Sequence, residues 1–300
     1  MLAYPVVVTS WFHDLISLLA HCHSNNVILR SLLTDQIVIS SGGVAKISGL
    51  YRCTVLNPSD GKDSNPLKLA KRAADRSKRK GSKGGDDNDD ELTPTATTAP
   101  ELLLGCPRQS METDVWMVGC ILAHLLLGKP LFTGKGRTSF LISQYKIVGS
   151  PSSKNYEQGV RFPNYEKITK KYKRGVEKAF GHMMNDGAAE KYVPHIDLIA
   201  AMLHLDPAQR CSAAEAMQHP CLVEFAAATA QAGLRTKYAQ EWTELKETLL
   251  KSQEDRSESK RHQKRKAMLI SAAGTNAGGD ADDLYDLDDL LEPAKNIKTG

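Results

Sequence analysis

The stretch DVWMVGCILAHLLL, residues 114–127, decides the fold of this 300-residue chain. Apolar residues cover most of its helical circumference: Val115, Val118, Ile121, Leu122, Leu125 and Leu126. A helix that is apolar nearly all round is buried in the interior of a protein. Gly128 and Pro130 follow, and such residues typically end a helix. We therefore predict a buried helix over this stretch.

The spacing of other apolar residues predicts further helices and one hairpin. One helical stripe, which Asn25 and Asn26 end, consists of Trp11, Leu15, Leu18, Leu19 and Cys22. Residues 37–39 and 44–47 are short apolar runs separated by Ser-Ser-Gly-Gly, which is typical of a β-hairpin. Further helices are expected near residues 138–148, 194–204 and 212–218. The expected fold class is therefore mainly α, a helical bundle with a small β-hairpin.

Composition limits the class of protein. The net charge of +4 is modest, and a hydrophobic fraction of 41% is enough for a core. The six cysteines include no C-x-x-C pair, which argues against a zinc module or a disulfide scaffold and favours a reducing compartment. The N-terminus has neither a basic start nor a long apolar run, so we expect no signal peptide, no transmembrane helix and no membrane partner.

Residues 53–94 differ in composition from the patterned segments on either side. Eight Lys or Arg residues lie between Lys68 and Lys83, and residues 86–91 are mostly acidic. Charged blocks of this kind cannot bury apolar area, so we expect a disordered insertion. The basic run could also bind nucleic acid or act as a nuclear import signal.

Several short motifs occur in an order that resembles a known family. They are residues 21–30, Ala99-Pro100-Glu101, residues 113–121, residues 128–134, residues 148–151, the run LDPAQR at residues 205–210, and His219-Pro220. Together they resemble the catalytic loop, the A-P-E motif, the central helix and the later signatures of cyclin-dependent kinases, which are Ser/Thr kinases of the CMGC group. The resemblance covers about residues 8–225.

The resemblance implies a protein kinase-like C-terminal lobe at residues 1–225 and a charged tail at residues 226–300. Because the chain starts only about twenty residues before the catalytic loop, we expect the N-terminal lobe to be absent. The resemblance also implies that Glu101 pairs with Arg210 and that Asp114 braces the catalytic loop. Arg30 corresponds to an arginine that contacts a phosphate in the family; a retained loop residue that binds backbone is the other reading.

The residues that carry kinase chemistry are replaced. Ser31 stands at the position of the catalytic Asp, and Gln36 stands at that of the metal-binding Asn. The D-F-G motif is either substituted, with Gly49 at the position of its Asp, or shortened by two residues, and neither alignment places an Asp there. No G-x-G-x-x-G phosphate loop occurs. The family uses ATP and magnesium, but for this chain we expect no cofactor and no metal site.

Other polar residues receive weaker assignments. His21 and His23 are two residues apart, so they lie on different faces of a helix, and we expect a structural role for His23. Tyr192 and His195 have no partner pattern, and no role is assigned to them. Possible phosphorylation sites precede the A-P-E motif: Thr93, Thr95, Thr97 and Thr98.

The tail contains three patterns. A helical stripe packs on the domain or docks to a protein partner: Leu234, Tyr238, Trp242, Leu245 and Leu249. A basic cluster is typical of nuclear import: Lys260, Arg261, Lys264, Arg265 and Lys266. Residues 280–292 alternate acidic and apolar side chains, as interaction segments do. The nucleus is therefore favoured over the cytoplasm.

Three functions compete. The first is a catalytically inactive, pseudokinase-like scaffold that binds proteins. The second is a Ser/Thr protein kinase, which transfers the γ-phosphate of ATP, seen as an incomplete chain. The third is a nucleic-acid-associated protein that acts through its basic segments, and we rank it last.

Overall fold

The described part of the chain, in a computed structural model, comprises residues 4–56, 93–106, 108–165, 168, 170–181, 189–229, 236–248, 251 and 261–262. The chain divides into a compact unit, Met1–Leu245, and a second unit, Lys246–Gly300. No helix among the described residues combines the length and the apolarity needed to cross a membrane. The fold below is that of the first unit.

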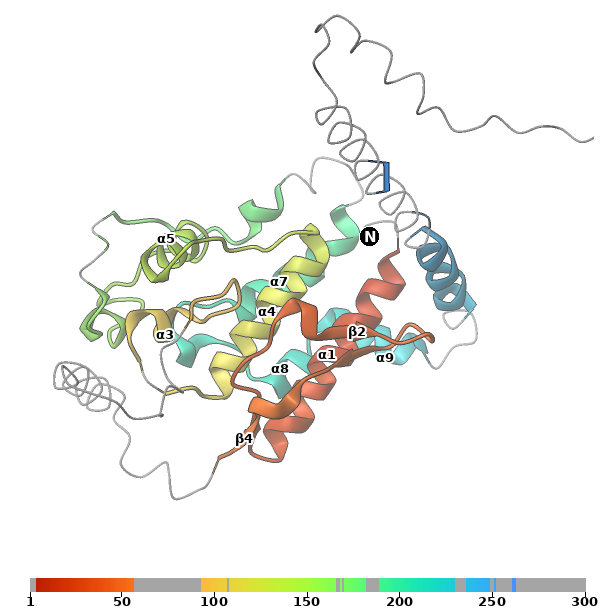
Figure 1. Ribbon diagram of the computed structural model, residues 1–300, viewed down its shortest axis with the longest axis horizontal. Helices are drawn as coiled ribbons and strands as arrows, with labels where there is room; N and C mark the ends of the chain where they lie inside the picture. The colour runs from red at the N-terminus through yellow and green to blue at the C-terminus, as the bar shows by residue number, and fades with distance from the viewer. Residues whose placement is uncertain are drawn as a thin grey trace, which may run out of the picture. The chain divides into compact units, whose positions relative to one another are not determined.

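The core forms around helix α4 (Met111–Leu127). This helix contacts α1 (Pro5–Ser24) and α7 (Val193–Met202), which lie close to it in Figure 1. Trp116 at its centre is fully buried and stacks on Phe132, with ring centroids 5.4 Å apart. The buried helix predicted at residues 114–127 is therefore confirmed. Its high apolar content is explained by neighbours on several sides.

Helix α1 begins at Pro5, a residue suited to the first helical turn, and ends before Asn25. Its stripe of Trp11, Leu15 and Leu19 is buried. Besides α4, it contacts α8 (Ala213–Met217) and α9 (Pro220–Thr229). Two further helices, α3 (Pro100–Leu104) and α5 (Arg137–Val148), pack on each other. The helices expected near residues 138–148, 194–204 and 212–218 are thus present.

Short 3₁₀ helices join these elements: η1 (Thr34–Gln36), η2 (Leu50–Arg52), η4 (Gly159–Arg161), η6 (Glu177–Phe180), η7 (Ala189–Tyr192) and η8 (Pro207–Gln209). Two small antiparallel sheets complete the fold. The predicted hairpin is β2 (Ile37–Ile39) with β3 (Ala45–Ile47), and Val38 lies opposite Lys46. The second sheet pairs β1 (Val27–Ile28) with β4 (Thr54–Val55).

Strand β4 moves the start of the expected insertion. A disordered insertion is expected at about residues 53–94, but Thr54 and Val55 pair with Ile28 and Val27. The N–H of Leu56 also donates to the Asn26 carbonyl oxygen at 2.7 Å. Backbone pairing therefore orders the beginning of this segment although its side chains are exposed or half-buried. Residues 57–92, including the basic run, lie outside the described residues.

The compact unit continues to Leu245, past residue 225, where the kinase-like domain is expected to end. Helix α9 continues to Thr229, and residues 236–248 are helical. In this C-terminal helix Trp242 lies edge-on to Trp11, 6.3 Å between ring centroids, and Leu245 is only 2% exposed. Apolar burial against α1 therefore extends the compact unit. Leu234, Leu249 and the acidic segment at residues 280–292 lie outside the described residues.

A buried carboxylate from the C-terminal helix caps α1. Glu241 Oε2 accepts the N–H groups of Val6 at 2.9 Å and Val7 at 3.2 Å. The first N–H groups of a helix have no partner within it, and a negative charge there is favourable. α1 has no acidic residue in its own first turn. The cap therefore comes from a residue 235 positions away in the sequence.

Candidate functional site

The segment that resembles a catalytic loop is held by the buried carboxylate of Asp114. Asp114 Oδ2 accepts the N–H of Leu29 at 2.6 Å, and Oδ1 accepts the N–H of Arg30 at 3.1 Å. His23 Nε2 lies 3.2 Å from Oδ2. Arg30 has a φ of 62°, an unusual value for a residue other than glycine. Asp114 thus fixes the loop from α4, and His23 has the structural position expected of it.

Ser31 follows directly in this loop. Its N–H donates to the Leu29 carbonyl oxygen at 2.7 Å, and its side chain is half-buried. In phosphoryl transfer this position needs a carboxylate that accepts the substrate hydroxyl proton. A serine hydroxyl does not accept a proton at neutral pH as a carboxylate does. The loop therefore holds its shape without offering a general base at this position.

The side chain of Gln36 is engaged with the backbone. Its Oε1 accepts the N–H of Leu33 at 2.9 Å, which closes the turn that contains η1. Its carbonyl oxygen accepts the N–H of Ser48 at 2.8 Å, which joins η1 to the segment after β3. Gln36 therefore stabilises the loop through its one side-chain oxygen. Oε1 is also the one atom of a glutamine side chain that can coordinate a metal ion.

Gly49 has a φ of 76° and precedes η2. This backbone conformation is easily adopted by glycine, but the residue carries no ligand atom. Magnesium is usually held by carboxylate oxygens. Within the described residues no group of three or more His, Cys, Asp or Glu side chains could hold a metal ion. Gly49 has no side-chain ligand atom and Gln36 has one neutral amide oxygen, so these two residues lack the carboxylate with which the kinase family holds magnesium.

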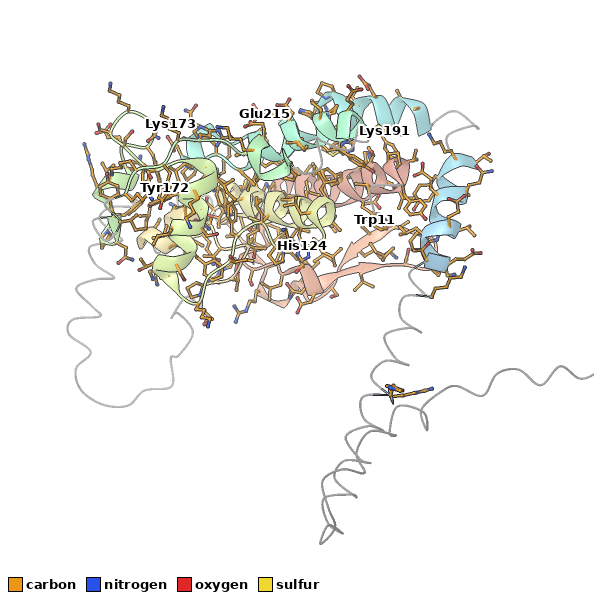
Figure 2. The ribbon with its side chains drawn as sticks, turned by 90° about the horizontal axis from the view of Figure 1, so that it is seen from above. Trp11, His124, Tyr172, Lys173, Lys191 and Glu215 are labelled. Carbon is orange, nitrogen blue, oxygen red and sulfur yellow. The ribbon has the colours of Figure 1, made fainter. Side chains whose placement is uncertain are left out.

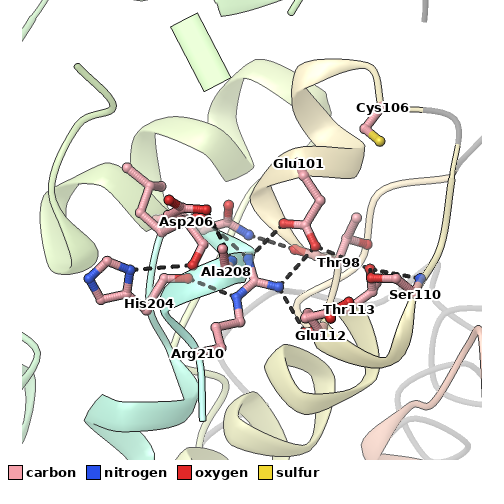
Figure 3. Close-up of polar contacts among 12 residues, drawn as sticks. Thr98, Glu101, Cys106, Ser110, Glu112, Thr113, His204, Asp206, Ala208 and Arg210 are labelled. Carbon is pink, nitrogen blue, oxygen red and sulfur yellow. Dashed lines mark hydrogen bonds and ion pairs between the residues drawn. The ribbon is translucent and has the colours of Figure 1, made fainter. Parts of the chain in front are cut away.

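Glu101 and Arg210 form a buried, bidentate ion pair (Figure 3). Arg210 donates to Glu101 Oε1 at 2.9 Å and to Oε2 at 2.7 Å. It also donates to the carbonyl oxygens of His204 and Glu112, both at 2.8 Å. Its guanidinium carbon lies 5.0 Å from the centroid of the Trp116 ring. This cluster joins α3, α4 and the segment after η8, and so anchors the A-P-E motif to the core.

The side chain of Arg30 is exposed and binds neutral groups. Its Nε donates to Gln109 Oε1 at 2.9 Å, and one terminal nitrogen lies 3.5 Å from Thr54 Oγ1. These contacts keep it between β4 and the segment before α4. They suit a retained loop arginine, and its exposed guanidinium also stays open to a phosphate.

The four threonines before the A-P-E motif have different environments. Thr97 and Thr98 are 4% and 6% exposed. Thr97 Oγ1 donates to the Leu32 carbonyl oxygen at 2.9 Å, and Thr98 Oγ1 accepts the N–H of Thr95 at 2.8 Å. Thr95 is half-buried, whereas Thr93 is exposed. In this conformation Thr93 is the member of the group that another kinase could reach.

His195, to which the sequence assigned no role, joins α7 to α1. Its Nε2 lies 2.8 Å from Thr9 Oγ1, and its ring packs edge-on to Phe12 and against Tyr192. Burial lowers the pKa of His195 to about 4, with a smaller contribution from the charge of His219. The imidazole is therefore neutral at pH 7 and serves the packing of the core. His21 is exposed and lies outside this cluster.

Glu241 and the capping role of Gln36 were not found from the sequence. Glu241 is one of several glutamates in a charged helix, and no local pattern distinguishes it from its neighbours. In the sequence, Gln36 stands at the position of the family's metal-binding Asn, and this correspondence gives no indication of a cap. A glutamine three residues after the start of a turn is a known capping position, so that signal was present for Gln36.

The family model for the protein kinase domain matches residues 5–222. This chain belongs to the protein kinase family. Among curated proteins, it is similar to cyclin-dependent kinase 20 of Mus musculus, with 28% identity over 215 residues, which cover 72% of this chain and 54% of that protein. The same kinase of Homo sapiens is 29% identical over 212 residues, which cover 71% and 53% of the two chains.

A probable serine/threonine-protein kinase of Arabidopsis thaliana is 28% identical over 276 residues, which cover 88% of this chain and 42% of that protein. The chain thus spans about half the length of the curated relatives it matches. The resemblance to cyclin-dependent kinases agrees with these relatives.

Proposed function

We propose that this chain is a catalytically inactive, pseudokinase-like C-terminal lobe that acts as a binding scaffold. One observation carries the proposal: the loop is fully braced by Asp114, yet Ser31, Gln36 and Gly49 supply no carboxylate. Contacts that serve folding are kept, whereas groups that serve phosphoryl transfer are replaced.

The size of each loss supports inactivity. Removing a general base alone costs about 10²–10⁴-fold in rate, which can leave measurable activity. Phosphoryl transfer depends mainly on positioning and on the charge of bound metal ions. The side-chain oxygen of Gln36 is already bound to the Leu33 N–H, and Gly49 has no side chain. The loss of metal binding adds to the loss of the base.

Thermal unfolding in the presence of ATP and magnesium tests the proposal. A ligand that binds only the folded chain at 100 times its Kd stabilises it by about 2.7 kcal/mol, which raises the Tm by several degrees. We expect no change in Tm up to millimolar ATP with magnesium. A rise that saturates with ATP concentration would count against an inactive scaffold.

A second candidate is Ser/Thr phosphotransfer by a longer form of the protein. It is favoured by the printed names of the relatives, which are kinases, and by the share of their length that this chain spans. Sequencing the 5′ end of the transcript tests it. A Gly-rich loop and a V-A-I-K lysine in frame before Met1 would restore nucleotide binding as a possibility.

Nuclear localisation and nucleic-acid binding remain proposals from composition. Of the basic cluster, Arg261 belongs to the described residues; the others, like the run at residues 68–83, lie outside them. Nuclear import is tested by replacing Lys264, Arg265 and Lys266 with Ala in a fusion to a fluorescent protein. If the variant still accumulates in the nucleus, the basic cluster is not the import signal. Nucleic-acid binding through these segments would weaken steeply with salt.

A further inference from the structure

A concave surface rich in lysine lies at one end of the fold, away from the catalytic-loop segment. This hollow is open to solvent, has a volume of about 500 Å³, and is lined by residues at the end of α4, the end of α5 and η6. Its cations, which define the basic pocket, are Lys129, Lys146, Lys173, Arg174 and Lys178. Figure 2 shows Lys173 at the opposite end of the fold from Trp11.

Hydrogen bonds tie two residues of the basic pocket, Arg174 and Gly175, to the neighbouring helices. Arg174 donates to the carbonyl oxygens of Leu203 at 2.9 Å and Ala200 at 2.6 Å, which fixes it to the end of α7. The N–H of Gly175 donates to the Ile147 carbonyl oxygen at 2.9 Å. Three chain segments therefore contribute cations to one hollow, and the Arg174 side chain and the Gly175 backbone are held by hydrogen bonds. A pre-formed site loses less entropy when a ligand binds.

The four lysines of the basic pocket are not paired with a carboxylate in the part of the chain that the structure describes. All four are exposed, and none forms an ion pair within the described residues. Glu177 interacts electrostatically with Arg174 but does not line the pocket. Four ammonium groups that surround one hollow repel each other and create a positive potential, which attracts an anionic ligand.

The composition of the lining indicates which class of anionic ligand the pocket favours. The lining also includes apolar side chains, among them Leu127, Leu131 and Ile147. No described residue of the lining is aromatic, so the pocket offers no ring on which a base could stack. Carboxylates flanking an apolar side chain would match both the lysines and the apolar residues of this lining. A volume of about 500 Å³ lies within the range of sites that hold small ligands or short peptide segments.

We propose that the basic pocket binds an acidic segment of a partner protein, with an apolar side chain of that segment seated between the lysines. This inference rests on the proposed scaffold function and names one class of partner for it. The experiments distinguish failure of this inference from failure of the proposed function. Peptide binding is measured without nucleotide, whereas catalytic inactivity is measured without peptide.

Fluorescence anisotropy on the full chain tests the inference. The probe is a labelled synthetic peptide of alternating aspartate and leucine; the comparison probes are an all-aspartate peptide and a single-stranded oligonucleotide of equal charge. We expect the Asp/Leu peptide to bind most tightly at low salt. The double variant Lys146→Glu with Lys173→Glu should weaken its binding by about tenfold or more, because charge complementarity is reversed.

The matched control is Lys46→Glu with Lys154→Glu, which reverses two exposed lysines outside the basic pocket. We expect the control to bind the peptide as the unaltered chain does. Equal weakening by the two double variants would show attraction to net charge alone and overturn the inference. Absence of peptide binding, or stronger binding of the all-aspartate peptide or the oligonucleotide, would also overturn it. Since all four lysines are exposed, circular dichroism should show unchanged folding.

Discussion

Replacing Arg210 with methionine should destabilise the fold far more than any exposed charge change. The variant removes two hydrogen bonds to Glu101 and leaves the carbonyl oxygens of His204 and Glu112 without that donor. Glu101 is 3% exposed and would be left with Thr113 as its remaining side-chain donor, at 3.1 Å. Breaking a buried ion pair on one side costs about 3–5 kcal/mol. A whole domain is stable by only about 5–15 kcal/mol.

Urea unfolding followed by tryptophan fluorescence measures this loss. The control is Arg161→Met, which breaks the exposed ion pair with Glu157 and should cost under about 1 kcal/mol. Glu101→Gln should cost less than Arg210→Met, because Arg210 keeps its carbonyl acceptors. A loss for Arg210→Met no larger than that for Arg161→Met would refute the anchoring role of the pair.

Three further predictions follow from buried groups. Glu241→Gln should lower the free energy of unfolding by about 1–2 kcal/mol, as loss of a helix cap does, and an unchanged urea midpoint would contradict the cap. Because the pKa of His195 is lowered to about 4 in the fold, the unfolded chain takes up its proton first as the pH falls. The free energy of unfolding should therefore decrease as the pH falls from about 6.5 to about 4. Urea unfolding at several pH values should show a weaker pH dependence for His195→Gln than for the unaltered chain. An equal pH dependence in the two proteins would show that His195 is not its cause. A Ser/Thr kinase added to the folded chain should phosphorylate Thr93 and not Thr97, and mass spectrometry that finds phosphate mainly on Thr97 would contradict its burial.

The parts of the fold that the sequence predicted are those with strong periodicity. The stretch at residues 114–127 is apolar on most sides, and it forms the centre of the core. The hairpin of β2 and β3 has β-branched runs and a Ser-Ser-Gly-Gly turn. Strands β1 and β4 were missed, because two residues are too few to show a period of two.

The roles that depend on distant partners could not be read from the sequence. Glu241 meets Val6 and Val7 only after the chain has folded. The burial of Thr97 depends on the Leu32 carbonyl oxygen, 65 residues away. The basic pocket likewise gathers lysines from three segments that look like ordinary exposed charges in the sequence. By contrast, Ser31 could be compared with the catalytic Asp from the sequence alone, because the motifs on either side of the loop occur in the order of the family.

The most direct test of inactivity is phosphate transfer itself. The folded chain is incubated with γ-labelled ATP, magnesium and a general Ser/Thr protein substrate, and incorporation is compared with that of the heat-denatured chain. We expect no incorporation above the denatured control, because Ser31, Gln36 and Gly49 provide neither the base nor the metal ligands. Incorporation that requires the folded chain, and that disappears in the variant Ser31→Ala with Gln36→Ala, would contradict the proposal that this kinase lobe has lost its chemistry.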